Sequence, residues 1–315
     1  MEATTPSPPG VPHRPVPPTS AEAPDLGPGR PDTIRSFAFF PYRGDERLTG
    51  PEAGIRAWAD VLSALASLAE PEEWTGTELA RTVLPILNSY VRYTYQRLVI
   101  EDKIAVTDDG EYAAFNTGLL TQYAEDIFGL FQKNRSENPN AQPWFFLRWA
   151  TESDRDIMKC FPESPQMAEY VTTAADLVYD WRRELKLNYE HIIGDNVERF
   201  PPELAGSPAR ARSALAYAVE LTLKRVRRNY KLVVPEWYPR LREAGFLMPL
   251  DLTGSGNADL ALVVSAVGDN SYRGHTVLTL EMAYTHARLV ARPDSEWLKP
   301  QAPEAAVLED APGDE

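Results

Sequence analysis

The chain has 315 residues, and its 46 acidic residues outnumber the 32 Lys and Arg residues to give a net charge of −14. Sequence-independent attachment to a nucleic-acid backbone needs clustered cations, so this composition confines any phosphate contact to a local groove. The one cysteine, Cys160, excludes an internal disulfide, and no apolar run has the length of a signal-peptide core or a membrane span. We therefore predict a cytoplasmic protein without membrane contacts.

Both ends of the chain differ in composition from the middle. Residues 1–31 hold ten of the 28 prolines, and residues 299–315 hold five acids and one lysine. Neither segment has enough apolar side chains to offset the entropy of ordering it, so we predict two disordered tails. Residues 32–298 then form a single α+β domain, with 50–135 and 140–298 as the expected sub-lobes. The proline-rich tail suits polyproline II structure, which protein partners can recognise.

Helices are predicted in the first third of the chain. Before them, residues 36–43 form a short aromatic strand or arm. Apolar residues recur every three or four positions from Pro51 to residue 69, which predicts a helix that begins at the proline. A second helical pattern begins near residue 77, and Pro85 within it predicts a kink or a break.

A β-hairpin follows these helices. Residues 104–107 and 111–116 have the pattern of two strands, joined by Asp-Asp-Gly. Two helices before a hairpin are the outline of a winged helix, although any α+β domain can contain the same run. Beyond the hairpin we predict an amphipathic helix over 121–133, a buried strand over 144–149 and mostly helical structure over 152–186.

The last third of the chain changes from helix to strand. Ser207 and Pro208 are typical N-cap and first residues of the longest predicted helix. The later run 260–267 is apolar on both faces, which favours a central strand. We expect further strands at 231–234, 246–252 and 276–280, and a helix at 281–290. The fold class is therefore α+β, a helical N-terminal part with a β-hairpin packed on a C-terminal mixed β-sheet.

The densest group of polar side chains lies in the stretch 187–202. On a helix, His191, Asp195 and Arg199 would share one face at i, i+4 and i+8. An aspartate raises the basicity of a neighbouring histidine, so His191 is the candidate general acid or base. Arg199 would bind a phosphate through its guanidinium. Asn196 would orient polar groups of the ligand. The alternative is a salt-bridged helix end without a chemical role.

A second candidate site lies at the end of the predicted hairpin. Asn116, Thr117 and Gly118 form a predicted turn before a helix, where exposed backbone amides favour an anion. The same residue types are equally common in ordinary turns and helix caps. We name all three as candidate ligand-binding residues and keep the ordinary turn as the alternative.

Two more groups of candidates lie on helices of the C-terminal half. Arg225 and Arg228 belong to a basic helix end, which either lines a phosphate groove or complements the helix dipole. Glu281, Tyr284 and Arg288 share one face of the last helix, as a binding face or as an internal polar network. Histidines and cysteine are too scattered for metal-ligand spacing, so we predict no metal site, and the cofactor stays open.

Several motifs resemble a known protein family when they are taken together and in order. The matching segments are FNTGLLTQYAEDIFGLF, NYEHIIGDNVERFP, PLDLTGSGNADLALVVSAV and HTVLTLEMAYTHARLVARPDSEWL. They are similar to the bacterial and fungal domain-of-unknown-function family 3825, over roughly residues 51–298. Members of this family are often joined to RNA-binding modules such as cold-shock-like domains. The resemblance therefore implies RNA or nucleotide handling, and it carries no catalytic residues onto this chain.

Two functions follow from these observations. The first is an RNA- or nucleotide-binding protein in which the hairpin end, the His191 stretch and the basic helix end converge on a phosphate-bearing ligand. If the protein is an enzyme, His191 would act in phosphodiester or nucleotide hydrolysis or transfer. The second is a non-catalytic interaction protein, which recruits partners through residues 1–31.

Overall fold

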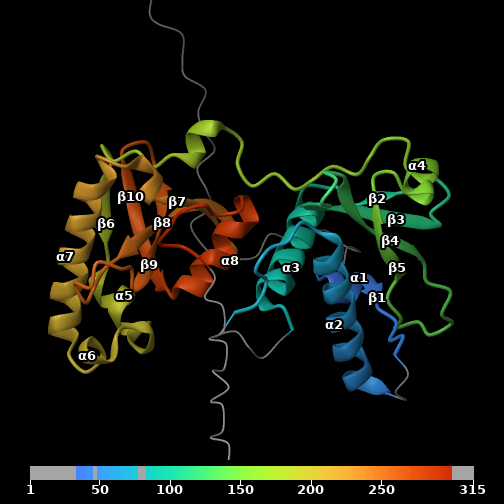
Figure 1. Ribbon diagram of the computed structural model, residues 1–315, viewed down its shortest axis with the longest axis horizontal. Coiled ribbons are helices and arrows are strands. Elements are labelled where there is room, and N and C mark those ends of the chain that lie inside the picture. Colours follow the sequence, from blue (N-terminus) through green and yellow to red (C-terminus); the bar gives the residue numbers. More distant parts are fainter. Residues whose placement is uncertain (1–32, 45–47, 77–82, 300–315) are drawn as a thin grey trace, which may run out of the picture.

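The computed structural model describes residues 33–44, 48–76 and 83–299. The predicted tails lie outside this part of the chain except for Lys299, so partner recruitment by residues 1–31 stays a prediction. The described residues form helices and two five-stranded sheets, which confirms the α+β class. In Figure 1 the two sheets lie at opposite ends of the long axis, with helices between them.

The N-terminal sheet has the strand order β1-β5-β4-β3-β2. Its first strand pairs in parallel with β5, and the other neighbours are antiparallel. The hairpin predicted after the helices is confirmed, since β2 and β3 pair at this edge. The strands are β1 (Ala38–Phe39), β2 (Ala105–Val106), β3 (Tyr112–Leu120), β4 (Asp126–Lys133) and β5 (Trp144–Thr151).

Helices cover both faces of the N-terminal sheet. One face packs against α1 (Ile34–Phe37), α2 (Gly50–Leu68) and α3 (Pro85–Ile100), and the other packs against α4 (Arg155–Cys160). The indole N–H of Trp149 donates to the carbonyl of Val61 at 2.8 Å, which fixes α2 on the sheet. Because a helix lies on each side, the strands have long apolar runs instead of simple alternation.

The helix predicted over 121–133 is wrong. Residues 121–125 form a turn, and the strand β4 occupies the rest of the segment, from residue 126 to 133. Its Ile127 and Phe131 face α2 and α3, while Phe128 and Leu130 face α4. A strand buried on both faces is a continuous apolar run, and such a run also satisfies helical spacing.

Proline and the hairpin account for the other differences in this half. Of the kink or break predicted at Pro85, the structure shows no kink, since Pro85 is the first residue of α3, where its missing N–H costs nothing. The start of the predicted helix, residues 77–82, lies outside the described residues. The winged-helix outline is not confirmed, since the hairpin is the edge of a five-stranded sheet. The N-terminal half is therefore a layered sheet and not only a helical part.

The C-terminal sheet has the strand order β6-β10-β9-β8-β7. Its edge strand β6 is parallel to β10, and the remaining pairs are antiparallel, so the predicted mixed sheet is confirmed. The run 260–267 is the central strand β9, as predicted. The strands are β6 (Glu184–Leu187), β7 (Val234–Tyr238), β8 (Glu243–Leu250), β9 (Leu260–Val267) and β10 (Ser271–Leu278).

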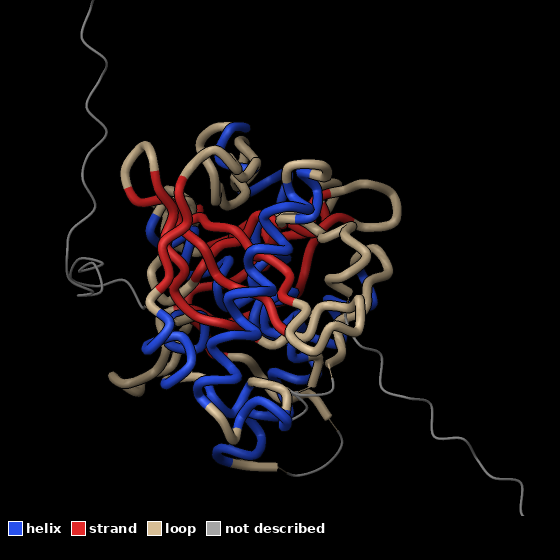
Figure 2. Tube along the Cα trace, turned by 90° about the vertical axis from the view of Figure 1, so that its left-hand side faces the viewer, coloured by secondary structure: helices blue, strands red, loops and turns tan. Residues whose placement is uncertain are grey.

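The faces of the C-terminal sheet pack against different helices. Leu260 and Leu262 of β9 lie in a core with α5 (Tyr189–Gly194), α6 (Pro202–Ala205) and α7 (Pro208–Val226). Figure 2 shows a long helix in front of these strands. On the opposite face, Ala261 and Val263 pack in the core that contains α8 (Leu280–Val290). Successive side chains of β9 therefore pack alternately against the helices on the two faces of the sheet.

A long connector joins the two halves, and it is not the helical segment predicted over 152–186. After α4 it contains one 3-10 turn, η1 (Ala174–Leu177), and it ends in β6. Ala168 and Tyr170 are buried in one core, whereas Tyr179 is buried in another. Its apolar residues thus anchor the chain at separate places instead of forming one helix face.

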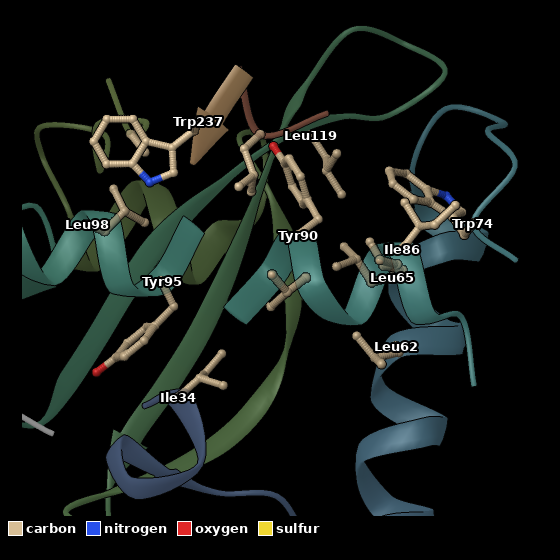
Figure 3. Packing of buried hydrophobic residues seen from close by; sticks show 14 of the residues in the cluster. Ile34, Leu62, Leu65, Trp74, Ile86, Tyr90, Tyr95, Leu98, Leu119 and Trp237 are labelled. Carbon is tan, nitrogen blue, oxygen red and sulfur yellow. The ribbon is translucent and has the colours of Figure 1, made fainter. Parts of the chain in front are cut away.

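The core on the inner faces belongs to both halves. It contains Phe115 of β3, Tyr95 of α3, Val263 of β9 and Ala287 of α8. Figure 3 shows Trp237 of β7 lying above Leu98 of α3, so a side chain of the C-terminal sheet packs on an N-terminal helix. In the part of the chain that the structure describes, no helix combines the length and hydropathy needed to cross a membrane.

Candidate functional site

A cavity of about 430 Å³ lies where the two halves meet. It is lined by α3, the end of β3, the connector at 167–171 and the end of α8, together with residues that follow α2. We name it the junction cavity. Its volume lies within the range of small-molecule sites, which are commonly found between lobes of a fold.

The wall formed by α8 contains a buried ion pair. The Nε atom of Arg288 lies 2.7 Å from Oε1 of Glu72, and the side chains are only 11% and 5% exposed. The hydroxyl of Tyr284 donates to the same carboxylate oxygen at 3.1 Å. The predicted face of the last helix is therefore real, and two of its three residues meet at one acid. Glu281, the third, is buried beside Gly76.

Aromatic rings hold the guanidinium of Arg288 against the cavity wall. Its central carbon lies 4.7 Å from the ring centre of Tyr90 and 5.2 Å from that of Trp74. Burial alone would lower the pKa of Arg288, but the neighbouring Tyr90 and Glu72 raise it above the ordinary value. The guanidinium is thus a permanent cation in a water-poor site.

Two aromatic side chains at the cavity, Tyr90 and Trp74, have buried polar groups. Burial raises the pKa of Tyr90, against the opposing effect of Arg288, so its hydroxyl stays protonated. In Figure 3 the Tyr90 ring extends from α3 toward Leu119. The indole N–H of Trp74 is buried and has no hydrogen-bond acceptor among the described residues.

The acids around the cavity are largely neutralised. Glu72 is paired with Arg288, and Glu169 lies 3.2 Å from Nζ of Lys103. Glu70 and Arg292 add one charge of each sign to the lining. The cavity can therefore accept an anion in spite of the acidic chain, because the local field is set by these pairs.

The Asn116-Thr117-Gly118 motif has one residue at the cavity. Gly118 lines it, with a φ of +71° and a position where a Cβ atom would lie 2.8 Å from Oη of Tyr90. Asn116 accepts from the amide of Gly118 at 2.8 Å and donates to the carboxylate of Asp126 at 3.2 Å. Thr117 donates to the carbonyl of Ile127 at 2.7 Å. Asn116 and Thr117 are buried, so the predicted turn with exposed amides is wrong, and their role is to shape the strand.

The His191 stretch is broken into two short turns. His191 lies in α5, and its Nδ1 is 2.7 Å from Asp195 in the predicted i, i+4 pair, with both side chains more than half exposed. The chain then changes direction into the 3-10 turn η2 (Val197–Arg199). Arg199 donates to the carbonyl of Val277 at 2.6 Å, so it does not share the face of His191. The predicted continuous helix face is wrong, because Asn196 donates back to Ile192 and ends the helix.

The polar side chains after His191 hold α5 on the sheet. Asn196 is buried, and its carbonyl oxygen accepts from the hydroxyl of Thr276 at 2.9 Å. At the end of α7, Arg225 and Arg228 are exposed, and Arg228 donates to the carbonyl of Lys224 at 2.8 Å. That contact satisfies a terminal carbonyl of the helix.

The structure does not bring the three predicted motifs into one cleft. Asn116 lies on β3, whereas His191 and Arg228 lie at α5 and α7, at the other end of the long axis in Figure 1. Instead, Gly118 and Arg288, which were singled out separately, both line the junction cavity. The cavity thus joins the second and fourth candidate groups and leaves out the first and third.

A second polar cluster lies between α8 and the C-terminal sheet. Nδ1 of His286 is 3.0 Å from Oε2 of Glu236. The ring of Tyr238 lies 5.7 Å from that of His286 and 6.3 Å from that of His275. Nε2 of His275 is 2.6 Å from the hydroxyl of Ser265. None of these side chains lines the junction cavity.

Burial dominates the protonation of this second cluster. Glu236 is fully buried, and burial raises its pKa, although the contact with His286 acts in the opposite direction. Burial also lowers the pKa of His275, and the charge of Arg273 adds to this effect. Burial therefore favours the neutral forms of Glu236 and His275, which suits a role in fixing α8 on the sheet.

Sequence reasoning missed most of the cavity. Glu72 and Trp74 follow the end of α2 in a short polar segment, and only tertiary folding brings them to Arg288. One signal was present, since Tyr90 and Thr94 are polar positions at i, i+4 within the apolar pattern of α3. Tyr170, whose hydroxyl lies 3.2 Å from that of Thr94, comes from the connector and has no local signal.

The described residues contain no group of three His, Cys, Asp or Glu side chains placed to hold a metal ion. No curated protein and no solved structure matches the chain. A family model does match, over residues 65–297, and its description is a domain of unknown function, DUF3825. The match includes every strand of the two sheets except β1, and it includes all the residues that line the junction cavity. The chain therefore belongs to the DUF3825 family.

Proposed function

We propose that the junction cavity binds a nucleotide through its phosphate and its base. The observation that carries this proposal is the buried guanidinium of Arg288 on the cavity wall. Arginine has five N–H donors, and the contacts with Glu72 and Tyr90 leave others for a phosphate oxygen.

The other walls suit the base and the sugar. Tyr170 and Tyr90 present aromatic rings, and Leu119 and Met167 supply apolar surface. Aromatic rings stack on nucleobases of any kind, and each such contact contributes about 1–3 kcal/mol. The unpaired acid Glu70 is an acceptor for an amino group of the base. The volume of about 430 Å³ fits one nucleotide better than a folded RNA.

The proposal is for binding, and hydrolysis is not part of it. The lining contains no histidine, cysteine or serine among the described residues. His191, our candidate acid or base, is exposed on α5 and pairs with Asp195 outside this cavity. Hydrolysis or transfer of a phosphodiester at His191 stays a prediction that the cavity does not require.

Calorimetric titration of the full chain with AMP tests the proposal. AMP is expected to bind, and adenosine is expected to bind at least about tenfold more weakly, because it lacks the phosphate that Arg288 would contact. Leu120→Trp changes a half-exposed residue at the rim, so it should fold normally and block the cavity. It is expected to abolish AMP binding.

Two control variants make the result specific. His191→Ala removes an exposed side chain outside the cavity, so AMP affinity should not change. The paired change Arg288→Met with Glu72→Gln removes both charges together and avoids leaving either one buried alone. It should lose the preference for AMP over adenosine. Equal affinity for the two compounds in the wild type, or AMP binding that survives Leu120→Trp, would overturn the proposal.

A further inference from the structure

An aromatic ring at the surface of the C-terminal half holds two guanidinium groups. The central carbon of Arg182 lies 4.8 Å from the ring centre of Trp181, and that of Arg227 lies 5.2 Å from it. Trp181 is 38% exposed, and the Arg182 side chain is 72% exposed. The two arginines come from different segments, since Arg182 precedes β6 and Arg227 caps α7. Folding therefore gathers them on one ring.

More exposed cations and a second ring lie at the same end of α7. Arg225 and Arg228 are exposed, and Tyr230 in η3 (Tyr230–Leu232) is 60% exposed. We name this region the Trp181 surface. It consists of the residues in ring contact, Trp181, Arg182 and Arg227, and of the exposed residues near Arg227 in the chain, Arg225, Arg228 and Tyr230.

The acids near the Trp181 surface offset only part of its charge, since Asp180 pairs with one of its four arginines and Glu220 pairs with Lys224 instead. Asp180 lies 3.5 Å from a nitrogen of Arg182, and Glu220 lies 2.5 Å from Nζ of Lys224. The guanidinium of Arg228 also donates to a carbonyl, which costs it no charge. In a chain with a net charge of −14, this concentration of exposed arginine is a local positive field. It attracts an anionic partner that the remaining surface repels.

We propose that the Trp181 surface binds a single-stranded nucleic acid. Guanidinium groups recognise phosphate oxygens in a fork, and their planes stack on unpaired bases. Trp181 orients two of these planes in advance, so less side-chain entropy is lost when the strand binds. Tyr230 offers a further ring for a base. This site is separate from the junction cavity and does not depend on a nucleotide binding there.

The chemistry of the surface favours a strand over other anionic partners. An anionic membrane would be met by lysines and by apolar side chains that insert, whereas this surface presents arginines fixed by an aromatic ring. An acidic protein segment would satisfy the charges but would leave the stacking planes unused. A single strand uses both features, because its phosphates and its unstacked bases are exposed together.

Fluorescence anisotropy with a labelled oligouridylate of about twelve nucleotides measures the binding, since such sites commonly cover about 4–16 nucleotides. The full chain is expected to bind, with a logarithmic affinity that falls with logarithmic salt by about 0.7 per phosphate contact. Arg182→Ala with Arg227→Ala should weaken binding about tenfold or more and make the salt slope shallower by one to two phosphate contacts. Trp181→Ala should weaken binding while the charge is unchanged.

Matched controls separate this site from general electrostatics. Arg56→Ala with Arg135→Ala removes the same charge from exposed positions on the N-terminal half, and affinity should stay unchanged. An abasic sugar-phosphate oligomer of equal length should bind more weakly than the oligouridylate, because it lacks bases to stack. Leu120→Trp, which blocks the junction cavity, should leave strand binding intact. Loss of strand binding alone would therefore leave the nucleotide proposal standing.

Four results would overturn the proposal. The first is no binding of the oligouridylate at low salt, and the second is full affinity in the Arg182 and Arg227 double variant. The third is an equal loss of oligouridylate affinity in the Arg56 and Arg135 control, which would show that binding depends only on net charge. Binding to vesicles of anionic phosphatidylserine that depends on Trp181, with no oligouridylate binding, would identify a membrane surface in its place.

Discussion

Arg288 on α8 and Glu72 beyond the end of α2 form an ion pair with an Nε–Oε1 distance of 2.7 Å. The pair joins residues 216 positions apart in the chain. Both residues also line the junction cavity, at the place where the two halves meet. The pair therefore contributes both to the packing of the two halves and to the nucleotide binding that we propose.

Breaking this pair from one side should strongly destabilise the protein. Glu72→Ala leaves the guanidinium of Arg288 buried without its carboxylate, so we expect a loss of about 3–5 kcal/mol in the free energy of unfolding. Urea denaturation followed by circular dichroism measures this loss. The matched control is Arg135→Ala, which breaks an exposed pair with Glu111 and should cost less than about 1 kcal/mol. Similar losses in both variants would contradict the assignment.

The same contact allows a test by a double variant. Arg288→Met with Glu72→Gln removes both charges and keeps similar volume, so it should be more stable than Glu72→Ala alone. The difference measures the cost of an uncompensated buried charge. The matching single variants are Arg288→Met and Glu72→Gln. A double variant whose loss of stability equals the sum of their two losses would show that the residues do not interact.

Gly118 should tolerate no side chain, because a Cβ atom would both strain the backbone and approach Tyr90 too closely. Gly254 is the control that has the backbone strain alone. Both have positive φ, +71° and +76°, so alanine strains the backbone at either position. Only at Gly118 would the Cβ atom also meet Oη of Tyr90, at 2.8 Å, whereas the space around Gly254 is open. We expect Gly118→Ala to cost about 1–3 kcal/mol more than Gly254→Ala. Thermal unfolding of the two variants measures the difference, and equal losses would contradict the close approach.

Thr222 should contribute through one hydrogen bond between α7 and the C-terminal sheet. Its buried hydroxyl donates to the carbonyl of Pro249 at 2.6 Å. Thr222→Val removes the donor and leaves the carbonyl buried, so we expect a loss of about 1–3 kcal/mol in urea denaturation. Ser213→Ala is the control on the same helix, because its exposed hydroxyl bonds only to Ala209 of its own helix. An unchanged stability of Thr222→Val would show that water replaces the donor.

Glu236 should make stability depend on pH. Burial raises its folded-state pKa above 4.5, while in the unfolded chain the carboxyl titrates near that value. Between the two pKa values the folded state holds the proton and the unfolded state does not. The contribution of Glu236 is therefore fully present below pH 4.5 and is lost as pH rises through the folded pKa.

Glu236→Gln removes this titration and keeps the shape of the side chain. The stability of the wild type minus that of the variant should fall as pH rises above 4.5 and then level off. Denaturation at a series of pH values measures this difference. Repeating the comparison in a His286→Gln background removes the histidine that contacts Glu236. A difference that rises with pH, or does not change, would contradict the buried neutral carboxyl.

Much of the C-terminal half was predictable because its patterns are local. Ser207 and Pro208 mark the start of α7, and the doubly apolar run 260–267 is a central strand. The N-terminal sheet was underestimated for a physical reason. Strand β4 is buried on both faces, so its apolar residues lose the alternation that distinguishes a strand from a helix.

The candidate site was predictable only in pieces. Spacing on α8 put Tyr284 and Arg288 on one face, and both reach Glu72. No local pattern indicates that Gly118 lies at the same cavity, because the contact is made through Tyr90 of a different element. The His191 stretch attracted attention by its density of polar residues, yet density along the chain does not measure convergence in space.

The inner core has a consequence for how the molecule melts. Tyr95, Phe115 and Val263 belong to one continuous apolar layer, to which both sheets contribute. If either sheet unfolded alone, the apolar side chains of the other sheet in this layer would be exposed to water. The two sheets should thus lose structure in one cooperative transition, seen in calorimetry as a single peak whose van't Hoff and calorimetric enthalpies agree.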